Sequence, residues 1–206
     1  MHPTEILSAE HRVIEIVLAA LDRMTEKTAA DGRLEKQPAL EAIDFIRNFA
    51  DGCHHAKEEG QFFPVLFEKG FAREYGPVAM MLHEHEIGRA HVRAMAEALD
   101  AASDGDPDAV QSFISQTRGY IALLRAHIQK EDQILFPMAD RTLTSDDQSR
   151  VSEAFDKTEA EEVGVGTHER YLKLAESLAD RYGVPHESLE HIHAHGSPAG
   201  NHRHHE

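Results

Sequence analysis

Two stretches of the sequence repeat one pattern of histidine and glutamate. HHAKEEGQFFP begins at His54 and HIQKEDQILFP begins at His127, and each has a glutamate four residues after its first histidine, Glu58 and Glu131. Four residues advance an α-helix by about 400°, so each pair lies on one helix face. Imidazole and carboxylate groups presented together are typical ligands of iron, manganese or zinc. The repeat therefore predicts a metal site.

A histidine on an earlier segment accompanies each motif. EHRVIE contains His11 and EHEIGR contains His85. His11 precedes His54 by 43 residues and His85 precedes His127 by 42, so the chain consists of two similar halves. Each half has the form of a helical hairpin, with one histidine on its first helix and the His-x-x-x-Glu motif on its second. Two hairpins related by a pseudo-twofold axis would bring four histidines and two glutamates to one level.

Four long amphipathic segments are expected to position these residues. The first runs from about Thr4 to Thr28, the second opens after Pro38, the third starts near Pro77, and the fourth follows SDGDPD. Apolar residues recur in them at spacings of three and four, the period of a helix with one buried face. Short polar connections make long helices antiparallel neighbours. The sequence predicts an all-α fold, an up-down-up-down four-helix bundle over residues 1–143.

Two further segments follow the bundle. Residues 144–183 are predicted to form two extra C-terminal helices that pack on it. Residues 184–206 hold a cluster of histidines without a core-forming pattern, and we expect a flexible, disordered His-rich tail. The tail has two interpretations: it gathers metal ions loosely, or it is a soluble end without a role.

All six side chains of the repeat fall on apolar stripes. His11 lies between Leu7 and Ile14, for example, and His54 continues the stripe of Ile46 and Ala50. Ionised groups are almost never buried unless they are paired or bound to metal. We expect no core lysine or arginine at these levels, whereas two dications would neutralise the set. One such residue alone would be an ordinary core or surface side chain, but the duplicated set indicates a dinuclear site.

The complete pattern, His … His-x-x-x-Glu … His … His-x-x-x-Glu with KEE..FFP and EHE.GR, resembles the hemerythrin-like (HHE cation-binding) domain over roughly residues 3–141. The resemblance implies a four-helix bundle with a non-haem di-iron centre that binds O₂ or related small ligands. Two iron ions would be bridged by the two carboxylates, with zinc or manganese as substitutes. Carried over by position, the ligands are His11, His54, Glu58, His85, His127 and Glu131.

The sequence departs from the oxygen-carrying members in one ligand. Those proteins have a second histidine one turn from the third-helix ligand, whereas here Met81 and Arg89 stand one turn from His85. One ligand is therefore expected to be missing, which would leave positions for water, O₂, peroxide or nitric oxide. His168, in the C-terminal segment, is an alternative source of that ligand.

Residues next to the ligands have further interpretations. Asp132 has the His-x-x-x-x-Asp spacing of the carriers and competes with Glu131, but the internal repeat favours Glu131. His55 and Glu59 lie about 100° from the ligands and are expected at the rim or surface. Tyr120 is expected to be a core tyrosine bonded to a backbone carbonyl, with donation to a bound oxygen species as the alternative.

Charge and composition exclude several classes of partner. The net charge of −16 argues against nucleic acid and against an anionic membrane surface. No stretch reaches the roughly 20 apolar residues of a membrane span. The single cysteine, Cys53, cannot form an internal disulfide, and the N-terminal residues lack the apolar run of a signal peptide, so a cytoplasmic location is expected.

Three functions fit these features. The first is binding or sensing of O₂, nitric oxide or peroxide at the di-iron centre. The second is a di-iron enzyme that decomposes peroxide or processes nitric oxide. The third is non-catalytic handling of iron or zinc. The expected partner is a small diatomic ligand or peroxide, and the sequence identifies no redox or protein partner.

Overall fold

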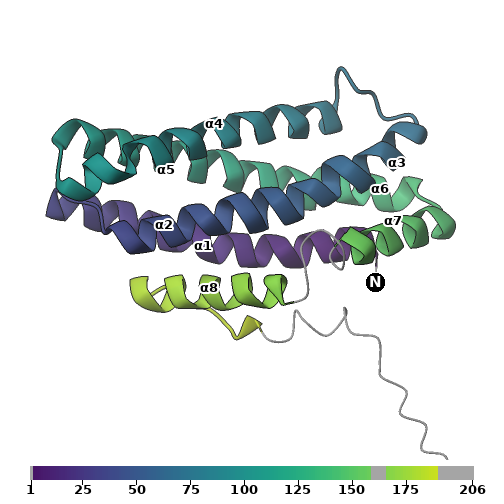
Figure 1. Ribbon diagram of the computed structural model, residues 1–206. Helices are drawn as coiled ribbons and strands as arrows, with labels where there is room; N and C mark the ends of the chain where they lie inside the picture. Colours follow the sequence, from purple (N-terminus) through teal and green to yellow (C-terminus); the bar gives the residue numbers. More distant parts are fainter. Residues whose placement is uncertain (1, 159–165, 190–206) are drawn as a thin grey trace, which may run out of the picture.

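The computed structural model describes residues 2–158 and 166–189, and all regular secondary structure in this part of the chain is helical (Figure 1). The prediction of an all-α fold is confirmed. In chain order the elements are α1 (Pro3–Asp31), α2 (Lys36–Phe45), η1 (Ile46–His55), η2 (Glu58–Phe62), α3 (Phe63–Glu68), α4 (Pro77–Asp104), α5 (Pro107–Lys130), η3 (Glu131–Leu135), α6 (Phe136–Thr142), α7 (Ser145–Thr158) and α8 (Thr167–Tyr182).

These elements build four long helical columns that lie side by side in Figure 1. α1 is the first column, α2 to α3 the second, α4 the third, and α5 to α6 the fourth. α4 packs against α5 and α2, and α1 packs against α5. Each column coincides with one of the amphipathic segments read from the sequence. Among the described residues, no helix combines the length and apolar character that crossing a membrane requires.

Local sequence signals set the ends of the columns. α1 begins at Pro3 and α4 at Pro77, in the first turn, where the missing proline N–H costs nothing. Gly32 follows α1 with φ 65° and Gly105 follows α4 with φ 87°, a left-handed conformation that favours glycine. The side chain of Asp106 then caps α5 by accepting a backbone N–H at 2.8 Å. The turns are therefore fixed by the residues that the sequence places there.

The apolar core is divided into two clusters by a polar layer. On α1, Leu7 belongs to one cluster and Ile14 to the other, with His11 between them. On α4, Met81 and Val92 likewise belong to different clusters on either side of the third-column histidine. All six predicted ligands are buried in this layer. Apolar packing above and below holds the four columns in register around it.

Three π-helical segments lie in the second and fourth columns, where the sequence predicted continuous α-helix. At the end of η2 the N–H of Phe63 bonds to the carbonyl of Glu58, five residues back, and Phe136 bonds to Glu131 in the same way after η3. The next residue in each case is a proline, which cannot donate and crowds the carbonyl four residues before it. A wider turn relieves that crowding. The repeated Phe-Pro pairs thus shape the helix directly after each glutamate.

The C-terminal helices lie against the outside of α1. α7 contacts η2 and α1, and α8 runs along α1 and α2 (Figure 1). Arg170 pairs with Asp44 at 3.0 Å, while Leu172 and Leu178 join the larger core cluster. Leu189 is also buried there. The rest of the predicted His-rich tail, residues 190–206, and the middle of the C-terminal segment, residues 159–165, lie outside the described residues.

Candidate metal centre

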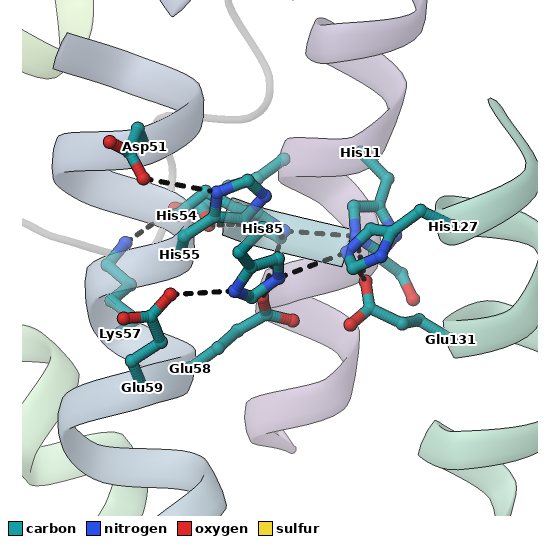
Figure 2. Close-up of polar contacts among 12 residues, drawn as sticks. His11, Asp51, His54, His55, Lys57, Glu58, Glu59, His85, His127 and Glu131 are labelled. Atoms are coloured by element: carbon teal, nitrogen blue, oxygen red, sulfur yellow. Dashed lines mark hydrogen bonds and ion pairs between the residues drawn. The ribbon is translucent and has the colours of Figure 1, made fainter. Parts of the chain in front are cut away.

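The six predicted ligands meet in the polar layer and form two groups (Figure 2). In each group, one ligand atom from every residue lies within 4.8 Å of all the others. We call the groups site 1 and site 2. Site 1 consists of His11, His54, Glu58 and Glu131, and site 2 consists of His55, Glu58, His85 and His127. Five imidazoles and two carboxylates thus converge, all of them buried.

The two carboxylates lie between the sites. Glu58 is 3.8 Å from Nε2 of His54 and 3.4 Å from Nε2 of His85. Glu131 is 3.2 Å from Nε2 of His11 and 3.3 Å from Nε2 of His127. Each carboxylate therefore faces one histidine of each site. That is the placement expected of two groups that bridge a pair of cations.

The convergent atoms are poorly satisfied by protein alone. Nε2 of His11 lies 3.0 Å from Nε2 of His54, and the corresponding atoms of His85 and His127 are 3.2 Å apart. Among the described residues, none of the four oxygens of Glu58 and Glu131 accepts a well-aligned hydrogen bond. Buried polar atoms nearly always have such partners. Facing nitrogens around unsatisfied carboxylates fit cations of intermediate hardness, such as iron, manganese or zinc.

The charges of the cluster are strongly perturbed. Burial and the neighbouring Glu131 carboxylate raise the pKa of Glu58 to about 7. Burial lowers the pKa of His11, but Asp132 and Glu131 outweigh it and raise that pKa to about 9. The carboxylates therefore favour positive charge at the ligand positions, and a metal ion that bound there would displace any proton on Nε2.

Every histidine of the centre is oriented by a carboxylate on its other ring nitrogen. Because a carboxylate only accepts, Nδ1 carries the proton and Nε2 keeps its lone pair for a metal. The pairs and their Nδ1–O distances are His11 with Asp132 at 2.9 Å, His54 with Glu10 at 3.0 Å, His55 with Asp51 at 3.3 Å, His85 with Glu59 at 2.7 Å, and His127 with Glu84 at 3.0 Å.

Cationic side chains hold these orienting carboxylates in turn. Lys57 bonds to Glu10 at 2.5 Å, and Lys130 bonds to Glu84. The expectation of no core lysine was wrong, because Lys57 is fully buried. Burial alone raises the pKa of Glu10, but Lys57 and His54 outweigh it and lower that pKa to about 2. The sequence reasoning considered only the ligands and so left out the charges needed behind them.

The arrangement follows the internal repeat. In the first half, Glu10 accepts from His54 and from Lys57. In the second half, Glu84 accepts from His127 and from Lys130 in the same way. The repeat was visible in the sequence: a glutamate directly precedes the first histidine of each half, and a lysine follows the second by three residues. Two ligand rings also stack on matched phenylalanines: Phe136 lies 5.5 Å from the His11 ring, and Phe63 lies 6.1 Å from the His85 ring. These orienting residues could have been found by extending the comparison of the two halves.

His55 breaks the symmetry and corrects one expectation. We expected it at the rim or surface, but it is buried, and its ring stacks on that of His85 at 3.8 Å. The reason is η1: a π-helix turns less per residue than an α-helix, so His54 and His55 both face inward. Burial and His85 hold the pKa of His55 well below its usual value, which keeps the neutral ligand form. His55 adds a third imidazole to site 2.

Other sequence alternatives lie outside the two groups. Met81 is buried in the apolar cluster, and Arg89 bonds to Asp51 and Glu59. The ring of His168 lies 5.4 Å from that of Phe49 and belongs to neither site.

Asp132, the alternative to Glu131, and Glu59 also lie outside the two groups. Asp132 bonds to Nδ1 of His11, the nitrogen opposite the one that faces site 1, so it orients a ligand and does not replace Glu131. Glu59, expected at the rim, is partly exposed and orients His85 in the same way.

Comparison with known proteins agrees with this geometry. The family model described as the hemerythrin HHE cation-binding domain matches residues 2–139. An uncharacterized protein of Mycobacterium tuberculosis and one of Mycobacterium bovis are each 24% identical to the chain over 180 residues, which covers 87% of this chain and 70% of theirs. No solved structure matches. The family match spans well over half of the chain and includes every residue of both sites, so the chain belongs to the hemerythrin HHE cation-binding domain family.

Proposed function

We propose that the chain is a non-haem di-iron protein that binds or senses O₂, and also nitric oxide or peroxide. The observation that supports it best is the pair of buried sites that share Glu58 and face Glu131. His11 and His54 would hold one iron, and His55, His85 and His127 the other. When bound, the iron pair would supply electrons to a small ligand and take them back.

The chain's own residues prepare the centre for this role. The five orienting carboxylates keep the protons on Nδ1, so that each Nε2 is ready to bind. The apolar clusters on both sides limit access of water. Preorganised ligands in a dry interior lower the reorganisation that a change in charge requires.

The identity of the metal, the order of the helices and the location of the protein are part of the same proposal. The mixed imidazole and carboxylate donors support iron, and they would also accept manganese or zinc. The up-down-up-down order of the helices is proposed on the sequence pattern. A cytoplasmic location is proposed because the single cysteine suits a reducing compartment.

Metal analysis combined with an optical spectrum tests the function. We expect two irons per chain after expression with iron, and a change in the near-ultraviolet bands when anaerobically reduced protein meets air. Two irons without a response to O₂, nitric oxide or peroxide would overturn ligand binding and support iron handling instead. A chain that retains no iron would overturn the centre itself.

Replacing His55 by Ala is expected to weaken metal binding at site 2 and leave site 1 occupied. The side chain belongs to site 2 alone. Loss of a residue that only orients a ligand typically lowers metal affinity by roughly 10–100-fold, and loss of one of three imidazole ligands should lower it at least as much. Metal titration followed by elemental analysis measures this. His168→Ala is the matched control and should keep both ions, whereas full affinity in His55→Ala would show that His55 is not a ligand.

A further inference from the structure

Arg89 lies behind site 2 and bonds to two of the orienting carboxylates at once. Its guanidinium is 2.7 Å from Asp51 and 2.8 Å from Glu59. Asp51 accepts from Nδ1 of His55, and Glu59 accepts from Nδ1 of His85 (Figure 2). One side chain is therefore linked, through one carboxylate each, to two of the three imidazoles of site 2.

The other cations behind the centre hold one orienting carboxylate each. Arg12 bonds to the carboxylate behind His11, Lys57 to the one behind His54, and Lys130 to the one behind His127. Within the described part of the chain, four cations thus hold five orienting carboxylates, and Arg89 is the cation that is shared. The histidine without a match in the other half, His55, is oriented through the cation that also acts on His85.

The two carboxylates that Arg89 holds are the ones that most need a fixed partner. The side chains of Asp51 and Glu59 are 33% and 31% exposed, whereas that of Glu10 is 2% exposed and fixed by packing. A pocket of about 160 Å³, lined by Asp51 and Arg89, lies beside them. One water needs only about 10–15 Å³ of such space, so water can compete for these carboxylates. The planar guanidinium opposes that competition with charge-assisted bonds.

Arg89 also joins two columns at the level of site 2. Asp51 lies on η1 and Glu59 on η2, whereas Arg89 lies on α4. Glu86, one turn earlier on α4, accepts from Nη1 of Arg89 at 2.6 Å and fixes the guanidinium from its own helix. The bonds to Asp51 and Glu59 therefore connect the second column to the third.

We propose that Arg89 is a positioning residue for site 2, which orients His55 and His85 together through their carboxylates. Losing it would free both carboxylates to turn toward water and would leave two imidazoles without a fixed acceptor. The inference rests on the proposed function, because it assumes that site 2 holds a metal ion. It adds a residue that contacts no ligand directly and yet acts on two of them.

Zinc titration of the full chain tests the inference. Calorimetry gives the affinities of the two sites, and His55→Ala identifies which of them is site 2. In Arg89→Gln the affinity of site 2 should fall roughly tenfold, the lower end of the range for loss of an orienting partner, because Arg89 acts through such partners. Removing a positive charge would by itself strengthen the binding of a cation. The expected change is therefore opposite in sign to a charge effect.

Proton NMR of the zinc-loaded protein gives a second readout. The Nδ1 protons of His55 and His85 should exchange with water faster in Arg89→Gln, because their acceptors are no longer fixed. The Nδ1 proton of His11, whose carboxylate is held by Arg12, should exchange as in the parent protein.

Two other arginines provide matched controls. Arg12→Gln removes the cation behind His11 and should weaken site 1 without weakening site 2. Arg93 is exposed and lines the same pocket as Arg89, but within the described residues it bonds to neither Asp51 nor Glu59. Arg93→Gln removes the same charge and should weaken neither site.

The outcomes separate the two proposals. Zinc binding at site 2 that is as tight or tighter in Arg89→Gln overturns the positioning role and leaves the metal centre standing. Equal weakening of both sites also overturns it, because that result indicates general loosening of the fold. In Asp51→Asn/Glu59→Gln protein, Arg89→Gln should cause no further loss, and an additional tenfold loss would contradict action through the carboxylates. A parent protein that binds neither zinc nor iron overturns the proposed function, and the inference with it, before any variant is compared.

Discussion

Glu58→Gln is expected to abolish tight binding of both metal ions. Glu58 is the one residue that belongs to site 1 and site 2 together, and its substitution removes one of two charges that neutralise the cation pair. The loss should exceed the roughly 10–100-fold that follows removal of an orienting partner. Elemental analysis should find well below one ion per chain, against two in the parent protein.

The neighbouring residue provides the control. Glu59 bonds to Nδ1 of His85 and to Arg89, so it orients a ligand without being one. Glu59→Gln should weaken site 2 yet still give two ions at saturating metal. Circular dichroism should show both variants helical. Glutamine at position 58 relieves the burial and the repulsion by Glu131 that raise the pKa of Glu58, and Glu59 is partly exposed. Two tightly held ions in Glu58→Gln would contradict the bridging role.

Lys57→Met should strongly destabilise the fold. Lys57 and Glu10 form a fully buried ion pair, and removing one partner of such a pair typically costs about 3–5 kcal/mol. For a chain of this size each kcal/mol lowers Tm by about 2–4 °C. We therefore expect Tm to fall by about 6–20 °C, which thermal unfolding of metal-free protein can measure.

The internal repeat supplies a matched comparison for this variant. Lys130 bonds to Glu84 in the same way, but its side chain is 35% exposed. Lys130→Met should cost clearly less, because water can solvate Glu84. Combining Lys57→Met with Glu10→Gln should recover most of the lost stability, since neither charge of the buried pair then remains. Equal losses for the two lysine variants would mean that burial does not decide the cost.

The fold and the meeting of six ligands followed from the sequence because both depend on α-helical periodicity and on the repeat. Spacing of three and four placed His11 and His85 on buried faces, and the duplicated motif aligned the remaining four. The ligand role of these six stays a prediction until metal is measured.

What the sequence reasoning missed depends on features outside that periodicity. His55 faces inward because η1 is a π-helix, and no α-helical count predicts that direction. Lys57 is buried because a second layer of charge stands behind the ligands. Tyr120 is a core residue as expected, but within the described residues its hydroxyl does not bond to a backbone carbonyl, because that contact depends on packing between columns and not on spacing along one helix.

The unmatched histidine makes the two halves of the molecule unequal. In the second half, Ile128 occupies the place of His55, so an otherwise duplicated scaffold offers two imidazoles on one side and three on the other. Limiting amounts of iron should therefore fill the richer position first and populate a singly loaded species. The two ions would then have different reduction potentials, although the scaffold is built from a repeat. Different potentials would allow electrons to be transferred one at a time.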